Sequence, residues 1–237
     1  MTTPPAMRLL VSVRSVNEAL LAAAGGADFI DLKEPSDGAL GGLPVATIDA
    51  IVGALRERGI VLPVSATIGD LDAAELAVIR ARVAAVGACG VDYVKVGISR
   101  SEGATDLLQA LAAGAHRVVP VFIADQGLDA ALVERACGLG FAGVMLDTAD
   151  KLSGSLFDAV PLPQLHGFVA QVRATGALVG LAGALRLHHV TLLEALAPDF
   201  AGFRTAVCGA DRRTALDPQR LRALVARVRG APVRCAD

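Results

Sequence analysis

The feature that most constrains the fold of this chain is a regular alternation of two kinds of segment. A short run rich in β-branched residues is followed, eight times in 237 residues, by an Ala- and Leu-rich stretch with helical spacing of its apolar residues. The predicted strands are Leu9–Val13, Asp28–Lys33, Ile60–Thr67, Val91–Gly97, Arg117–Ala124, Gly143–Asp147, Ala177–Ala182 and Gly202–Val207. The predicted helices are Val16–Ala24, Ala46–Arg58, Leu71–Val86, Asp106–Ala113, Leu128–Cys137, Leu162–Thr175, Val190–Ala197 and Pro218–Arg229.

The placement of glycine supports the same βα rhythm. Gly25, Gly138, Gly140 and Gly176 fall where a helix should end and the next strand begin, a place where a positive φ is useful. No shift in composition and no Pro/Ser-rich linker divides the chain, so we predict a single domain over residues 1–237. The class is α/β, and eight alternations favour a closed (β/α)8 barrel over an open doubly wound sheet, which is the main alternative.

Composition excludes several classes of protein. The 22 Lys and Arg residues nearly balance the 24 Asp and Glu residues, unlike the basic composition of a dedicated nucleic-acid binder. Hydrophobic residues make up 54% of the chain, which is enough for a large core and excludes a disordered chain. No apolar run reaches the roughly 18 residues that a membrane span requires, and we see no secretion signal. We therefore expect a cytoplasmic protein without a membrane or nucleic-acid partner, and its apolar character favours a homo-oligomer.

The cysteines and histidines do not indicate a metal site. Cys89, Cys137, Cys208 and Cys235 are scattered, with neither the paired spacing of metal ligands nor the density of a disulfide scaffold. We predict that they are reduced thiols, mostly small core residues. The four histidines have no ligand spacing relative to carboxylates or cysteines, so no metal is expected.

The lysines are the most informative residues for function. Only three of the 22 basic residues are Lys, and Lys33, Lys95 and Lys151 all map to the carboxyl ends of the second, fourth and sixth predicted strands. In a (β/α)8 barrel that rim carries the active site, and side chains from alternate strands share layers. A lysine can lose its proton and attack a carbonyl, whereas a guanidinium cannot. The alternative is that these are ordinary lysines extending to solvent from strand ends.

Two carboxylates accompany the lysines. Asp31 precedes Lys33 by two residues, so the strand period places both side chains on one face, either as a buried ion pair or as an acid/base couple. Asp147 ends the sixth strand, within reach of Lys151 if the intervening residues form a turn of helix. The alternative for Asp147 is a helix cap.

The last two predicted βα loops are candidates for binding phosphate. Glycine-containing segments with Gly183 and Gly209 follow the seventh and eighth strands, where barrels frequently hold phosphate on loop amides. Arg204 could add charge to that site or lie in an ordinary ion pair, and the sequence does not choose between the two.

Several motifs together resemble the (5-formylfuran-3-yl)methyl phosphate synthase family, also called 4-(hydroxymethyl)-2-furancarboxaldehyde-phosphate synthase. The motifs are FIDLKEPSDGALG from Phe29, VSATIGD, DYVKVG, VMLDTADK and FRTAVC, which span the chain from the second strand to the last. The resemblance implies a TIM barrel that condenses two glyceraldehyde 3-phosphate molecules into a furan phosphate for methanofuran- or methylofuran-type carriers, without a metal or organic cofactor. This chain departs from the family pattern at Thr205, where glycine is expected.

The resemblance also implies roles for residues. Lys33 corresponds to the Schiff-base lysine and Lys95 to the proton acceptor, while Asp31, Asp147 and Lys151 match the remaining motif positions. The hypothesis is that Lys33 forms an imine and that Lys95 removes the acidified proton. Two alternatives remain open: a class-I aldolase-like enzyme acting on a phosphosugar, and a non-catalytic barrel that binds phosphorylated metabolites.

Overall fold

The computed structural model describes residues 7–209 and 211–230. Eight parallel strands close into a barrel in sequence order, which confirms the predicted (β/α)8 fold and excludes the open sheet. The strands are β1 (Arg8–Val13), β2 (Phe29–Leu32), β3 (Val64–Thr67), β4 (Tyr93–Ile98), β5 (Val118–Ile123), β6 (Gly143–Asp147), β7 (Leu178–Leu181) and β8 (Phe200–Phe203).

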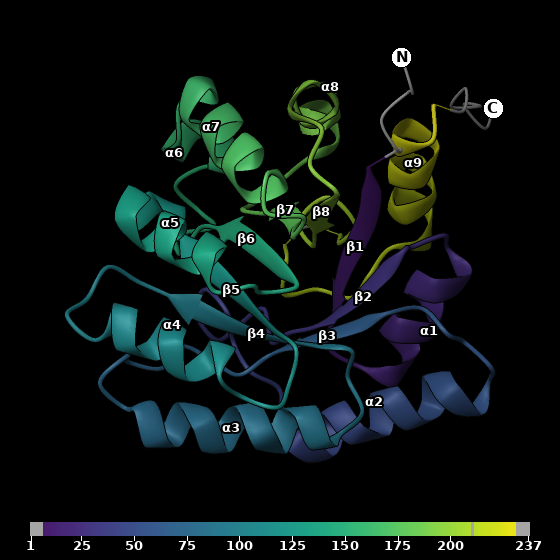
Figure 1. Cartoon of the computed structure of the whole chain (residues 1–237). Helices are drawn as coiled ribbons and strands as arrows, with labels where there is room; N and C mark the ends of the chain where they lie inside the picture. Colours follow the sequence, from purple (N-terminus) through teal and green to yellow (C-terminus); the bar gives the residue numbers. More distant parts are fainter. Residues whose placement is uncertain (1–6, 210, 231–237) are drawn as a thin grey trace.

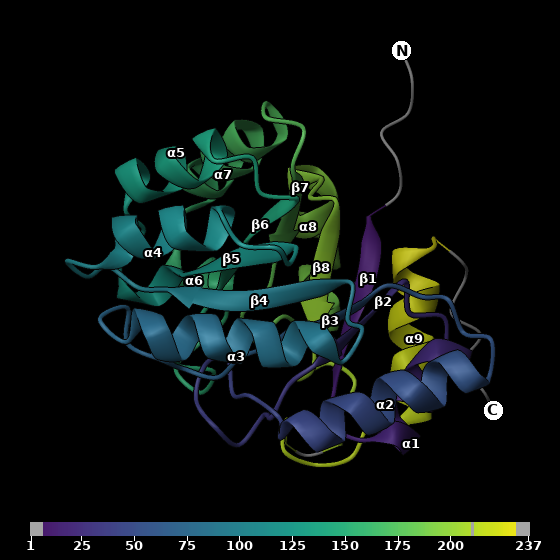
Figure 2. The same ribbon diagram turned by 60° about the horizontal axis from the view of Figure 1, so that its bottom comes forward.

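The helices lie around the outside of the strands (Figures 1 and 2). They are α1 (Val16–Ala24), α2 (Val45–Glu57), α3 (Leu76–Ala88), α4 (Ala104–Ala112), α5 (Ala130–Gly138), α6 (Leu156–Ala159), α7 (Leu162–Arg173), α8 (Val190–Leu196) and α9 (Pro218–Val228), with 3-10 turns η1 (Ala124–Gln126) and η2 (Leu187–His189). Within the described part of the chain, no helix is long and apolar enough to cross a membrane.

Three predicted boundaries are wrong by four residues or more. β3 begins at Val64 rather than at Ile60. β8 ends at Phe203, before most of the predicted strand, because Val207 and Cys208 are buried in a loop and imitate the apolar pattern of a strand. Helix α3 starts at Leu76 rather than at Leu71. Asp72 explains this late start, since its carboxylate accepts a hydrogen bond from the amide of Ala74 and its carbonyl accepts one from Glu75, which forms a turn.

The three described cysteines are free, as predicted. Cys89 and Cys208 are buried and Cys137 is partly buried. Cys235 lies outside the described residues.

The strand registers stack the inward side chains of the even strands in tiers. Residues that are paired between neighbouring strands point to the same side of the sheet. Because the strands are tilted relative to the barrel axis, the residue at a given height on the next strand lies one position beyond the paired residue. Residues of alternate strands at the same height form one tier. The lower tier is Phe29, Tyr93, Gly143 and Phe200; the middle tier is Asp31, Lys95, Met145 and Gly202; the upper tier is Lys33, Gly97, Asp147 and Arg204. Apolar packing therefore fills the base of the barrel, and charged groups fill its carboxyl end.

Glycine makes room inside the barrel. A Cβ added to Gly180 on β7 would overlap the ring of Phe200 in the lower tier. We predict that Gly180→Ala lowers the free energy of unfolding by about 1–3 kcal/mol, because the core must shift to accept the methyl group. Chemical denaturation measures this loss.

Gly167→Ala is the matched control. Gly167 lies in the interior of α7, and its added Cβ meets no atom within 4 Å. The control should raise the free energy of unfolding by about 0.5–1 kcal/mol, because alanine favours the helix. Equal stabilities for the two variants would contradict the packing described.

Candidate active site

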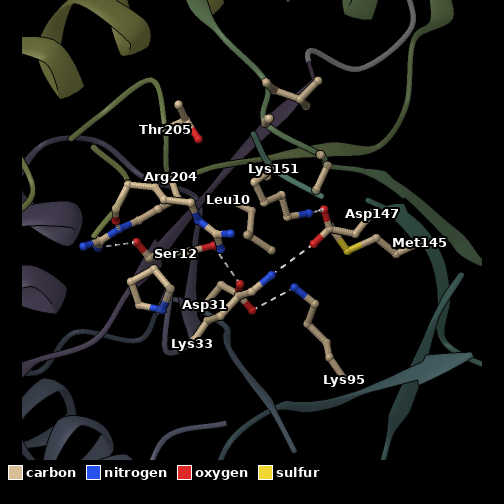
Figure 3. Close-up of a pocket in the computed structure, with 17 residues that line it drawn as sticks. Leu10, Ser12, Asp31, Lys33, Lys95, Met145, Asp147, Lys151, Arg204 and Thr205 are labelled. Atoms are coloured by element: carbon tan, nitrogen blue, oxygen red, sulfur yellow. Dashed lines mark hydrogen bonds and ion pairs between the residues drawn. The ribbon is translucent and has the colours of Figure 1, made fainter. Parts of the chain in front are cut away.

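A cavity opens at the carboxyl end of the barrel, and the space free of protein atoms there is about 480 Å³, including the solvent at its mouth. Its lining comes from β1, β2, β4, β6 and β8 and from the loops after β2, β6, β7 and β8. The charged residues among them are Asp31, Lys33, Lys95, Asp147, Lys151, Arg204 and Arg212. Figure 3 shows the three lysines directed toward the two aspartates. The structure therefore brings together all five residues that the sequence singled out as catalytic candidates.

The middle tier carries the first ion pair. Lys95 Nζ donates to Asp31 Oδ1 at 2.8 Å, and both side chains are almost fully buried. Ser65 Oγ donates to the same carboxylate oxygen at 2.7 Å, and Ser12 Oγ donates to Asp31 Oδ2 at 2.9 Å. Asp31 is therefore fixed by side chains from β1, β3 and β4, and it holds the amine of Lys95 beneath the upper tier.

The upper tier carries the second ion pair, which is shared by two lysines. Lys33 Nζ donates to Asp147 Oδ2 at 3.1 Å, while Lys151 Nζ donates to Asp147 Oδ1. Lys151 also donates to Thr148 Oγ1 at 3.3 Å. Lys151 contacts Asp147 as expected, but the residues between them do not form the turn of helix that the prediction assumed. Asp147 is not a helix cap.

The electrostatics of the site follow from burial and from the opposed charges. Burial opposes ionisation of Asp31, but the ammonium groups of Lys95 and Lys33 outweigh it and hold the pKa of Asp31 below its usual value. Asp147 behaves in the same way, and Lys151 and Lys33 lower its pKa. Burial lowers the pKa of Lys151 to about 8, with Asp147 opposing the shift and Lys33 adding to it. Lys151 is thus an amine that can lose its proton near neutral pH.

Arg204 forms an ion pair within the protein. Its five N–H groups all donate to protein acceptors. Two go to the buried carboxylate of Glu18 on α1, at 2.6 and 3.1 Å. Three go to the carbonyls of Ser12 at 3.1 Å, Arg212 at 2.8 Å and Thr214 at 2.7 Å. The guanidinium therefore connects the end of β1 to the loop after β8. The sequence left open whether Arg204 adds charge to a phosphate site or lies in an ion pair, and the structure shows the ion pair with Glu18.

The two glycine candidates lie in different surroundings. Gly183 lines the cavity, and no described residue accepts a hydrogen bond from its amide or from those of Ala184 and Leu185. Ala184 has a positive φ of 46°, an uncommon backbone state for a residue with a side chain. Gly209 does not line the cavity, and its amide donates to Thr214 Oγ1 at 3.2 Å.

Sequence reasoning missed three polar residues of the site. Ser12 follows Leu10 by two residues on β1, and Ser65 of β3 pairs with Asp31 of β2, so both serines point into the barrel. The alternation of inward and outward residues along each strand could have identified them. Arg212 reaches the cavity from the loop after β8, and within the described residues its side chain donates no hydrogen bond. No periodicity marks a loop residue of this kind. In the same part of the chain, no three His, Cys, Asp or Glu side chains are placed to hold a metal ion.

Fold and site together define a (β/α)8-barrel protein with a buried lysine–carboxylate centre at the carboxyl rim of its strands. The sequence model of the 4-HFC-P synthase family matches residues 9–225, which include every residue of this centre. The chain belongs to that family.

Relatives from bacteria and archaea agree with this assignment. A Methylorubrum extorquens protein, provisionally named (5-formylfuran-3-yl)methyl phosphate synthase, is 41% identical over 226 residues, covering 95% of this chain and 93% of the relative. The Archaeoglobus fulgidus (5-formylfuran-3-yl)methyl phosphate synthase is 34% identical over 243 residues, covering 94% and 100%. Both alignments span nearly the whole barrel.

Solved structures share the fold at low identity. The phosphoribosyl anthranilate isomerase of Thermus thermophilus has a TM-score of 0.67 at 20% identity, covering 94% of this chain and 99% of that one. The 3-hexulose-6-phosphate synthase of Salmonella typhimurium has a TM-score of 0.63 at 17% identity, covering 95% and 100%. These similarities concern the architecture alone.

The ion pair between Arg204 and Glu18 gives a test of the role of Arg204. We predict that Arg204→Lys lowers the free energy of unfolding by about 2 kcal/mol, because an ammonium cannot replace the planar five-donor group and leaves buried acceptors unpaired. Denaturant titration measures the loss.

Arg213→Lys, on the same loop, is the matched control. Arg213 is exposed and pairs with Asp211, so its replacement should leave the free energy of unfolding at the wild-type value. A wild-type stability for Arg204→Lys would contradict the structural role of Arg204.

Proposed function

We propose that the protein is a (5-formylfuran-3-yl)methyl phosphate synthase that condenses two glyceraldehyde 3-phosphate molecules through an imine on Lys33. The observation that carries the proposal is the pairing of three buried lysines with two aspartates around one cavity, in a chain of this family. An amine at Lys33, with a second amine nearby, is what imine formation followed by proton transfer requires.

The substrate phosphate is assigned to the β7–β8 side of the cavity. The amides of Gly183 and Ala184 have no acceptor among the described residues and border the cavity, and the cation of Arg212 lines the same space. Amides and a guanidinium are suitable donors for phosphate oxygens. Arg204 and Gly209 contribute indirectly in this proposal, because they hold the loop that carries Arg212.

The first bond forms between Lys33 and a triose. The neutral amine adds to the carbonyl carbon of one triose after isomerisation, water leaves, and the cationic imine makes the neighbouring C–H acidic. Lys95 acts in its neutral form, after its ammonium group has released a proton to solvent, and accepts the proton from that C–H. The enamine then attacks the aldehyde carbon of the second triose, and the resulting alkoxide takes the proton back from Lys95. Asp31 and Asp147 position the amines, because each carboxylate fixes a lysine with a direct hydrogen bond.

The remaining steps close the furan ring. One phosphate and two water molecules leave the two condensed trioses, and hydrolysis of the imine returns Lys33 as a free amine, so atoms balance without an oxidant or reductant. Lys151 relays protons in these eliminations, since it contacts Asp147 and its pKa lies near 8. The product would supply the biosynthesis of a methanofuran-type carrier.

Lys33→Arg tests the function directly. The arginine retains a positive charge for Asp147 but cannot form an imine, so we expect a folded protein that makes no furan. The readout is ultraviolet absorbance of the product together with released phosphate. Lys95→Arg, the companion variant, should slow the reaction by about a hundredfold or more, because it removes a proton acceptor.

The outcomes separate the alternative functions. Substantial furan formation by Lys33→Arg would contradict the proposal. Carbon–carbon bond formation without a furan would favour an aldolase, and ligand binding without any reaction would favour a phosphometabolite-binding barrel.

The pKa of Lys151 predicts a pH dependence. The neutral fraction of an amine with a pKa of about 8 rises from about a tenth at pH 7 to about nine tenths at pH 9. If neutral Lys151 accepts a proton in the slow step, kcat rises through this range. Lys151→Arg should lose the rise, because arginine stays protonated. A rise of equal size in the variant would assign the titration to another group.

A further inference from the structure

The loop that carries Lys151 has little packing of its own near that residue. It spans residues 148–154 and connects β6 to the start of α6. Asp150, Leu152 and Ser153 are exposed, and the exposed fraction of Leu152 is 90%. The carboxylate of Asp150 accepts hydrogen bonds from the amides of Leu152 and Ser153 at 2.8 and 3.0 Å, which closes a turn inside the loop. These contacts shape the loop, but they do not attach it to the barrel.

Asp125, after the end of β5, attaches the loop to the neighbouring strand. Ile123, two residues before Asp125, pairs with Asp147, two residues before Ala149. Asp125 Oδ1 accepts a hydrogen bond from the amide of Ala149 at 2.7 Å, and Asp125 Oδ2 accepts one from the amide of Asp150 at 2.8 Å. Among the described residues, no other group from outside this loop and β6 forms a hydrogen bond with the loop backbone. The carboxylate therefore fixes the two residues immediately before the lysine.

The fixed loop keeps Lys151 in surroundings that oppose its charge. The side chain of Lys151 is 6% exposed, and its Nζ donates to Asp147 Oδ1 and to Thr148 Oγ1. The charged groups that face it are Asp147, Lys33 and Arg212. Burial is the largest cause of its low pKa, so the ammonium form would gain hydration by leaving the cavity. The backbone must therefore be held in place if the amine is to stay beside Asp147.

We infer that Asp125 is a positioning residue: by binding the amides of Ala149 and Asp150 it holds the loop so that the amine of Lys151 stays in the cavity. The inference rests on the proposed function for the use that the reaction makes of Lys151. Asp125 is exposed and does not line the cavity, so it acts through the loop.

The titration of Lys151 tests the inference without requiring catalysis. The chain has only three lysines, so protein labelled with carbon-13 at lysine Cε gives three side-chain signals in an NMR spectrum. The signal of Lys151 is identified by its loss in Lys151→Arg. We expect a midpoint at about pH 8 in the wild-type protein. In Asp125→Ala the midpoint should rise by more than about one pH unit, toward the value of about 10.4 for a lysine in water.

The direction of the shift distinguishes movement of the loop from loss of a charge. Removing a carboxylate from a loop that stays in place would leave the midpoint unchanged or lower it, because one negative charge fewer stabilises the ammonium group. Release of Lys151 to solvent raises the midpoint instead. An unchanged or lowered midpoint in a folded Asp125→Ala variant, or a wild-type midpoint already near that of a lysine in water, would overturn the inference.

Two further variants separate this role from a general loosening of the structure. Asp129 also follows β5, and its carboxylate accepts hydrogen bonds from two amides at the start of α5, at 2.9 and 3.2 Å. Asp129→Ala removes this helix cap but releases no lysine, so the midpoint should stay at the wild-type value. Asp125→Asn keeps one acceptor oxygen and should raise the midpoint less than Asp125→Ala does. Equal shifts in Asp129→Ala and Asp125→Ala would refute the inference.

The reaction gives a second readout. In Asp125→Ala the rise of kcat between pH 7 and 9 should move to higher pH together with the NMR midpoint. A kcat profile that keeps its wild-type position while the midpoint moves would refute a role for Asp125 in the reaction.

The proposed function can fail separately from this inference. Absence of furan formation by the wild-type protein would refute the function, while a raised midpoint in Asp125→Ala would still support the holding of Lys151 by Asp125. Furan formation with an unchanged midpoint would support the function and refute the inference.

Discussion

The burial of two carboxylates among three ammonium groups is the constraint on which the site depends. Moving an isolated charge into a barrel interior is very unfavourable, and each charge is tolerated here because an opposite charge and further hydrogen bonds satisfy it. Asp31 on β2 pairs with Lys95 on β4, and Asp147 on β6 pairs with Lys33 after β2. The Asp147–Lys33 pair joins opposite sides of the barrel and forms only when the sheet has closed, so the charge network and the barrel stabilise one another.

The same arrangement explains why the amines of the three lysines lie around one cavity. Tiers formed by alternate strands place Lys33 above the Lys95–Asp31 pair, and Asp147 connects Lys33 to Lys151. The amides of the loop after β7 and the guanidinium of Arg212 border the cavity and are donors suited to anions. Arg204, which has no N–H left for a ligand, instead holds the loop that carries Arg212 in place.

The fold and the catalytic candidates were predictable because both follow from periodicity. Alternating segments predicted the barrel, and the strand ends placed Lys33, Lys95 and Lys151 at one rim. Contacts between distant loops and helices were not predictable. The partner of Arg204 is Glu18 on α1, and nothing in the local sequence of either residue marks that pairing. The loop around Val207 was predicted as a strand because it is buried, and buried loops are as apolar in sequence as buried strands.

Reductive trapping of the imine tests the central claim most directly. The wild-type protein would be incubated with glyceraldehyde 3-phosphate and borohydride, digested, and mapped by mass spectrometry. The account predicts a triose adduct on the peptide containing Lys33, with none on the peptides containing Lys95 or Lys151. An adduct confined to another lysine, or no adduct under conditions in which the furan forms, would contradict it.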